Sequence, residues 1–141
     1  MTEVSRWLFA AGASPFLFLG LAHALATPLT KSDRKGLSPR DPALADALEN
    51  ATPLLTRRTN MWLGWVGFNL SHSLGAVAFA AFVLAIAFTP GAYAVASSVC
   101  VPLATLVAGT YLALGLRYWF RTPIAGCAFS FASFVAAWLM R

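Results

Sequence analysis

Residues 60–77 read NMWLGWVGFNLSHSLGAV, and this stretch decides the fold. It is apolar enough to cross a lipid bilayer, yet it places Asn69, Ser71, His72 and Ser73 within five residues. Polar side chains at membrane depth need a partner from another helix, from water or from a ligand. The stretch therefore predicts a membrane-spanning helix and raises the question of what its polar residues contact.

The composition of the whole chain also indicates a membrane protein. Of its 141 residues, 59% are hydrophobic and 11% are charged, whereas typical soluble domains have about 45–50% and about 25%. Most of the charges gather between Lys31 and Arg58, which leaves long uncharged runs elsewhere. The net charge of +5 fits loops that face anionic lipid. No basic patch interleaved with aromatic residues indicates a nucleic-acid partner, so we expect none.

Four runs approach the ~20 apolar residues that a spanning helix needs. They predict an all-α fold, a four-transmembrane-helix bundle that forms one integral membrane domain over residues 1–141. The predicted spans cover about 7–27, 61–88, 93–116 and 123–140. Thr52 and Thr122 each precede a proline and are expected to start helices, because Thr caps a helix and Pro fits its first turn. The run from Thr89 to Gly91 is expected to end one.

The distribution of basic residues predicts the orientation. Six lie in the loop 28–60 and two in the turn between the last spans: Lys31, Arg34, Lys35, Arg40, Arg57, Arg58, Arg117 and Arg121. Only Arg6 and Arg141 lie on the opposite side. The positive-inside rule therefore places the loop 28–60 in the cytoplasm and both termini outside, and we expect a bacterial inner membrane. Asp41 and Pro42 predict a short helix over 41–50 on the membrane surface.

A cleaved signal peptide is the alternative for residues 1–26. This segment has Arg6, an apolar core and the small-x-small ending Ala24-Leu25-Ala26. Cleavage would place the basic loop outside, against the charge rule, and Glu3 weakens the basic start. We favour a retained helix, and the N-terminal sequence of the purified protein distinguishes the two.

Helical projection of the 61–88 span separates three faces. The first is an aliphatic stripe assigned to lipid, with Leu63, Val66, Leu70, Leu74, Val77 and Leu84. The second has small residues, and its Gly67, Ser71 and Gly75 are spaced by four, which favours close approach of another helix. Gly126 and Ser130 begin a similar seam in the last span. These five residues are predicted to pack helices.

The third face of the 61–88 span is the candidate ligand-binding site. Its polar residues Asn69, His72 and Ser73 are spaced by three or four, so their side chains point to one region, beside Trp65. The first span offers His23 as a partner. Hydrogen bonding between helices is the structural interpretation of this cluster, whereas a histidine at membrane depth favours a functional one.

Metal and catalytic chemistry find little support in the sequence. Two histidines are too few for a closed metal site, because no cysteine or carboxylate completes the set, so we predict no metal and no required cofactor. Haem between His23 and His72 is an alternative, since two histidines suffice as its ligands. No Asp or Glu lies within a span, which argues against a cation-coupled transporter. We assign no catalytic residue, because Ser71 and Ser73 diverge from His72 on a helix.

The run WVGFNLSHSLG at 65–75 and the later YWFRTP at 118–123 resemble a family of small bacterial four-helix membrane proteins without a defined activity. The resemblance implies four spans and marks the same polar cluster. It implies no activity.

Three functions fit these observations. We favour a non-enzymatic bundle, partnered by the lipid bilayer, that associates with another membrane protein or with itself, or binds an apolar small molecule between helices. The first alternative is a haem protein that transfers electrons through His23 and His72. The second is a membrane enzyme that acts on a lipid or isoprenoid, with His72 as acid–base and Asn69 as an orienting donor.

Overall fold

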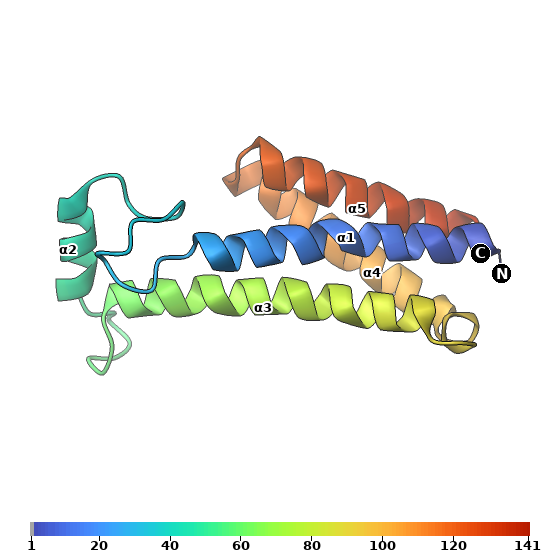
Figure 1. Cartoon of the computed structure of the whole chain (residues 1–141), viewed down its shortest axis with the longest axis horizontal. Helices are drawn as coiled ribbons and strands as arrows, with labels where there is room; N and C mark the ends of the chain where they lie inside the picture. The colour runs from blue at the N-terminus through green and yellow to red at the C-terminus, as the bar shows by residue number, and fades with distance from the viewer. Residues whose placement is uncertain (1) are drawn as a thin grey trace. The chain divides into compact units, whose positions relative to one another are not determined.

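The computed structural model describes residues 2–141, and these residues form an all-α structure without strands. The helices, in chain order, are α1 (Glu3–Ala26), α2 (Pro42–Asn50), α3 (Met61–Phe88), α4 (Ala92–Tyr118) and α5 (Arg121–Leu139) (Figure 1). All but α2 have between 19 and 28 residues and are apolar enough to cross a membrane. The four predicted long helices are confirmed, and the predicted span 61–88 coincides with α3.

The chain divides into two compact units. Unit 1 comprises the residues up to Leu19 together with Ala76–Arg141, and unit 2 comprises Gly20–Gly75. Unit 1 thus contains most of α1, the C-terminal part of α3, and all of α4 and α5. Unit 2 contains the end of α1, the whole of α2 with its flanking loops, and the first half of α3.

Capping by Asn60 decides where α3 begins. Its side-chain oxygen accepts a hydrogen bond from the backbone N–H of Leu63 at 2.8 Å, and its carbonyl accepts one from Gly64 at 3.0 Å. Such an acceptor satisfies N–H groups that have no partner inside the helix. The predicted helix start at Thr52 is wrong, because residues 51–60 form an irregular loop that α3 follows.

The other predicted helix boundaries have mixed outcomes. Thr122 does not start α5, since this helix begins at Arg121 and its N-cap position is Phe120, which makes no side-chain capping bond. The predicted end of the 61–88 helix is confirmed. There α3 stops at Phe88, and Gly91 has a φ of 75°, a left-handed conformation that glycine adopts without strain.

The predicted short helix in the long loop is confirmed as α2. Asp41 caps it, with a 2.9 Å hydrogen bond from the backbone N–H of Ala43 to the Asp41 side chain. Ala45 of α2 packs with Trp62 and Val66 of α3 to form the small core of unit 2. The assignment of Val66 to lipid is therefore wrong. Helical projection places it on the aliphatic stripe, but it does not show that α2 covers this turn.

Aromatic rings fill the core of unit 1. The Phe9 ring of α1 lies 5.4 Å from the Tyr93 ring of α4 and 5.7 Å from the Phe134 ring of α5, centroid to centroid. Two turns further along α1, the Phe16 ring packs edge-on against the Phe79 ring of α3, with 4.8 Å between the ring centroids. Tilted and edge-on pairs of this kind add to the stabilisation from apolar burial. These contacts join α1 to each of the other helices of unit 1.

Glycines allow α1 and α5 to approach closely in unit 1. A Cβ atom built at Gly12 would lie 2.6 Å from the Phe134 ring, and one built at Gly126 would lie 2.5 Å from Leu19 Cδ1. Ser130, one turn after Gly126, is fully buried. Small residues at such contacts permit the backbones to approach, which favours helix association in lipid.

We predict that Gly12→Ala destabilises the protein by about 1–3 kcal/mol, because its methyl group would overlap the buried Phe134 ring. The measurement is the free energy of unfolding in mixed micelles. Gly67→Ala is the matched control, since no described atom lies within 4 Å of a Cβ built there. It should be neutral or stabilising by up to ~1 kcal/mol. Equal effects of the two substitutions would contradict the proposed contact.

Candidate functional site

A polar contact between His23 of α1 and Asn69 of α3 joins these helices within unit 2. His23 Nε2 lies 2.8 Å from Asn69 Oδ1. The other end of the amide is held as well, because Asn69 Nδ2 donates to the carbonyl of Trp65 at 2.8 Å. This bond leaves Oδ1 as an acceptor, so His23 Nε2 carries the hydrogen and donates. Asn69 therefore fixes both the orientation and the tautomer of His23.

His72 lies beside this hydrogen-bonded pair. Its ring centroid is 5.2 Å from that of His23, and the two ring planes meet at 62°. Phe68, one turn earlier on α3, is stacked with His72 at 6.3 Å. Both histidines are partly buried. The structure thus brings His23, Asn69 and His72 together, on the face that the helical projection selects.

The remaining residues of the candidate face have other contacts. Ser73 is buried, and its hydroxyl donates to the carbonyl of Asn69 in its own helix at 3.0 Å. The indole of Trp65 lies 5.4 Å from that of Trp62. Trp65 takes part in the cluster through its carbonyl, which accepts from Asn69. Trp65 therefore holds the Asn69 side chain through a backbone carbonyl, and Ser73 bonds to the Asn69 backbone.

The geometry of the two histidines bears on the haem alternative. Two imidazoles that share one haem iron lie on opposite faces of the porphyrin, each with a nitrogen directed at the metal. Here His23 Nε2 is engaged by Asn69, and the ring centroids are only 5.2 Å apart. A porphyrin between them would require these contacts to open. Among residues 2–141 no cluster of three or more His, Cys, Asp or Glu side chains could hold a metal ion.

The two predicted packing seams differ. Gly126 and Ser130 lie in a close contact within unit 1, as described above. Gly67, Ser71 and Gly75 are exposed, and no described atom lies within 4 Å of a Cβ built at either glycine. The Ser71 hydroxyl donates to the carbonyl of Phe68 in the same helix. Within unit 2, therefore, no helix packs closely on this stripe, and its use by another element or another chain stays a prediction.

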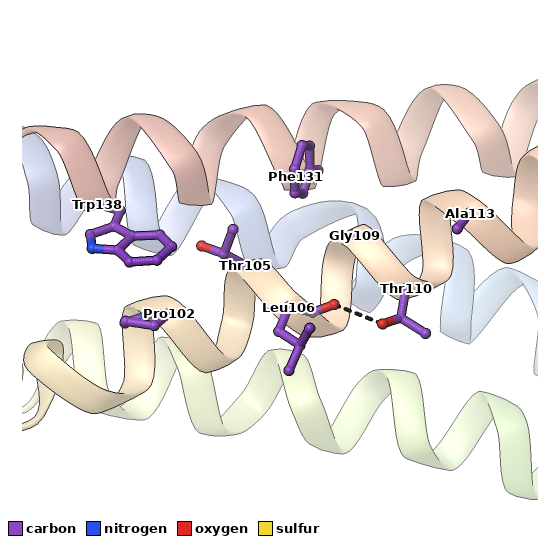
Figure 2. Close-up of a pocket in the computed structure, with 8 residues that line it drawn as sticks. All are labelled: Pro102, Thr105, Leu106, Gly109, Thr110, Ala113, Phe131 and Trp138. Carbon is purple, nitrogen blue, oxygen red and sulfur yellow. Dashed lines mark hydrogen bonds between the residues drawn. The ribbon is translucent and has the colours of Figure 1, made fainter.

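A groove between α4 and α5 of unit 1 is a second candidate site, which the sequence did not reveal. It has a volume of about 560 Å³, within the usual range for small-molecule sites. Figure 2 shows the lining side chains, which come from both helices. They are Pro102, Thr105, Leu106, Gly109, Thr110, Ala113, Phe131 and Trp138. The groove follows α4 from Pro102 to Ala113, a length of about 16 Å at 1.5 Å per residue.

The polar side chains of the groove bond to their own helix. The Thr105 hydroxyl donates to the carbonyl of Val101 at 2.9 Å. The Thr110 hydroxyl donates to the carbonyl of Leu106, also at 2.9 Å (Figure 2). A hydroxyl that donates its hydrogen to the helix backbone does not donate it to a ligand. The groove therefore offers mainly methyl groups and ring faces to a ligand, which suits an apolar chain.

A sequence signal for the groove exists in the third long span. Pro102, Thr105, Gly109 and Ala113 share one face of that helix, which reads as a packing stripe because the residues are small. The structure shows that Phe131 covers only part of this stripe, since a Cβ built at Gly109 would lie 3.1 Å from its ring. The rest of the stripe is the floor of the groove. Which part a neighbouring helix covers depends on helix placement, which periodicity does not report.

Comparison with known proteins finds no matching family model, no matching curated protein and no matching solved structure. The resemblance to small bacterial four-helix membrane proteins stays a prediction.

We predict a coupling free energy of about 0.6–1.7 kcal/mol between His23 and Asn69, the range of interhelical hydrogen bonds in membranes. A double-mutant cycle with His23→Ala and Asn69→Ala measures it from unfolding in mixed micelles. The control cycle pairs His23→Ala with Ser71→Ala, because the exposed Ser71 hydroxyl bonds within α3 to the carbonyl of Phe68. That cycle should give a coupling near zero. A similar value in both cycles would show that the His23–Asn69 bond does not join α1 to α3.

Proposed function

We propose that this protein is a four-span integral membrane protein that binds an apolar, chain-like ligand in the groove between α4 and α5. The ligand class is the hydrocarbon tail of a lipid or isoprenoid. The observation that carries the proposal is the apolar groove of about 560 Å³, whose threonine hydroxyls are bonded to the helix backbone. The proposal involves no chemical step, and binding is the activity.

Insertion in a bilayer is part of the proposal and has its own support. Four helices are long and apolar enough to span, and the charged residues concentrate in the connection between α1 and α3. The bias of basic residues favours a cytoplasmic position for this connection, with both termini outside. In that arrangement the groove opens to lipid, because its lining residues Leu106, Thr110 and Ala113 on the spanning helix α4 are exposed.

The length of the groove favours an acyl-type chain over a compact ligand. Its floor from Pro102 to Ala113 extends about 16 Å along α4. One leaflet contributes about half of the ~30 Å hydrocarbon core, so one tail of one leaflet matches this length. Trp138 lines the groove near the end of α5, and an indole is suited to the boundary between hydrocarbon and headgroups.

The His23–Asn69–His72 cluster has a structural role in this proposal. A buried amide that is bonded to a histidine of another helix stabilises the pair of helices, and leaving either group unpaired in an apolar medium is costly. The bond joins α1 to α3 in unit 2, whereas the groove lies in unit 1.

We predict that Ala113→Phe lowers the retention of a copurifying lipid, because the added ring would occupy one end of the groove. Removing about 60 Å² of apolar contact costs ~1.5 kcal/mol, which is roughly tenfold in affinity. The measurement is native mass spectrometry of the full chain purified in mild detergent, with lipid adducts counted over a range of activation energies.

Ala81→Phe is the matched control, because it adds the same ring at an exposed position of α3 that does not line the groove. It should retain the same adduct as the unsubstituted chain. Unfolding temperatures of the two variants should agree, since both alanines are exposed. Equal retention by Ala113→Phe and Ala81→Phe would contradict binding in the groove.

A further inference from the structure

The loop between α2 and α3 closes on itself and projects its tip away from the helices of unit 2. A 2.8 Å hydrogen bond from the backbone N–H of Met61 to the carbonyl of Ala51 joins its two ends. At the tip, Thr56 N–H donates to the carbonyl of Pro53, and Arg58 N–H donates to the Thr56 hydroxyl. Compact loops with closed ends of this kind are often functional. Figure 1 shows this loop between α2 and α3.

The tip of this loop carries two leucines that the folded chain does not cover. Leu54 is 109% exposed and Leu55 is 94% exposed, relative to a fully accessible leucine. Two adjacent leucines on a hydrogen-bonded turn form an apolar tip that is costly to leave in water. Hydrogen bonds within the loop hold the turn, and neither leucine belongs to the hydrophobic core of unit 2.

The acidic residues of unit 2 are already engaged. Lys31 lies 3.0 Å from an Asp46 oxygen and 2.6 Å from a Glu49 oxygen. These hydrogen bonds, first that to Glu49 and then that to Asp46, raise the pKa of Lys31. Asp33 lies 3.0 Å from Lys35, whose hydrogen bond lowers the pKa of the Asp33 carboxyl. The fourth, Asp41, caps α2.

Four arginines remain after this pairing. Within residues 20–75, all of which the structure describes, no carboxylate forms an ion pair with Arg34, Arg40, Arg57 or Arg58. Two of them, Arg57 and Arg58, directly follow the exposed leucine pair. The loop therefore places an apolar tip beside two unneutralised positive charges.

We propose that the loop 52–60 docks on anionic lipid, with Leu54 and Leu55 inserted among the headgroups and Arg57 and Arg58 bound to lipid phosphates. Charge complementarity selects this occupant, because a surplus of arginine beside an apolar tip matches an anionic bilayer surface in both properties. The loop precedes Met61, the first residue of a spanning helix, so it lies at the membrane surface. The inference rests on the membrane insertion that is part of the proposed function.

The two arginines determine the predicted preference for anionic over neutral lipid. Each arginine near an anionic surface strengthens binding about fivefold, so the pair should make docking roughly 25 times more favourable on anionic than on neutral lipid. The leucines contribute equally on both surfaces, because apolar insertion does not depend on headgroup charge. Removing the arginines should therefore abolish the selectivity, while removing a leucine should weaken docking on either surface.

The test uses the full chain in nanodiscs of phosphatidylcholine alone or with 30% phosphatidylglycerol, with bromine atoms on the acyl chains as quenchers. A single apolar fluorophore, which replaces the Leu55 side chain as the inserting group, is attached through Leu55→Cys after Cys100→Ala and Cys127→Ala. We expect strong quenching in the anionic discs and weak quenching in the neutral ones. The same fluorophore at Ser32→Cys, in the connection between α1 and α2, should show no such difference.

Arg57→Gln with Arg58→Gln should lower the quenching in anionic discs to the level of the neutral discs. Arg34→Gln with Arg40→Gln, which loses the same charge, should leave the quenching in anionic discs strong. An equal loss of quenching in both double variants would overturn the proposal, because the total positive charge of unit 2, and not the position of Arg57 and Arg58, would then explain the docking. Equal quenching in neutral and anionic discs would also overturn it. Resistance to alkaline extraction reports insertion separately, so failure of the four-span proposal is distinguishable from failure of the loop to dock.

Discussion

A polar group inside an apolar medium must find a hydrogen-bond partner, and the long helices depend on this constraint. Ser73, Thr105 and Thr110 satisfy it by bonding to carbonyls of their own helices. His23 and Asn69 satisfy it across two helices of unit 2. Ser130 is an exception, since its buried hydroxyl has no hydrogen-bond partner among residues 2–141. The same constraint makes the groove between α4 and α5 apolar, because the hydroxyls of its threonines donate to backbone carbonyls of α4.

The helices and their faces are predictable from sequence because they depend on local chemistry. Apolar length identifies the four long helices, and spacing by three and four places Asn69 and His72 on one face, where His23 of α1 meets them. Capping is harder to predict, since Asn60 and Thr52 are both acceptable caps, and only the observed bonds from Leu63 and Gly64 distinguish them. Burial of Val66 and exposure of Gly67 depend on where other elements lie, which helical periodicity does not report.

Small residues have three different roles in this chain, although they look alike in the sequence. Gly12 and Gly126 lie at close contacts of α1 with α5, so a side chain there would overlap a neighbour. Gly67 and Gly75 face open space. Gly109 lines the groove, and among residues 2–141 only the Phe131 ring lies within 4 Å of a Cβ built there. A stripe of small residues therefore predicts only that space exists beside a helix, and what occupies the space depends on the placement of its neighbours.

The central claim is that a hydrocarbon chain occupies the groove between α4 and α5. The most direct measurement is magnetisation transfer from lipid acyl protons to alanine methyl groups, recorded by NMR on the full chain in nanodiscs. The claim predicts that the Ala113 methyl, in the groove, shows strong and long-lived contact, while the Ala81 methyl, exposed on α3, shows only the weak contact of bulk lipid. Equal transfer to the two methyl groups would contradict it.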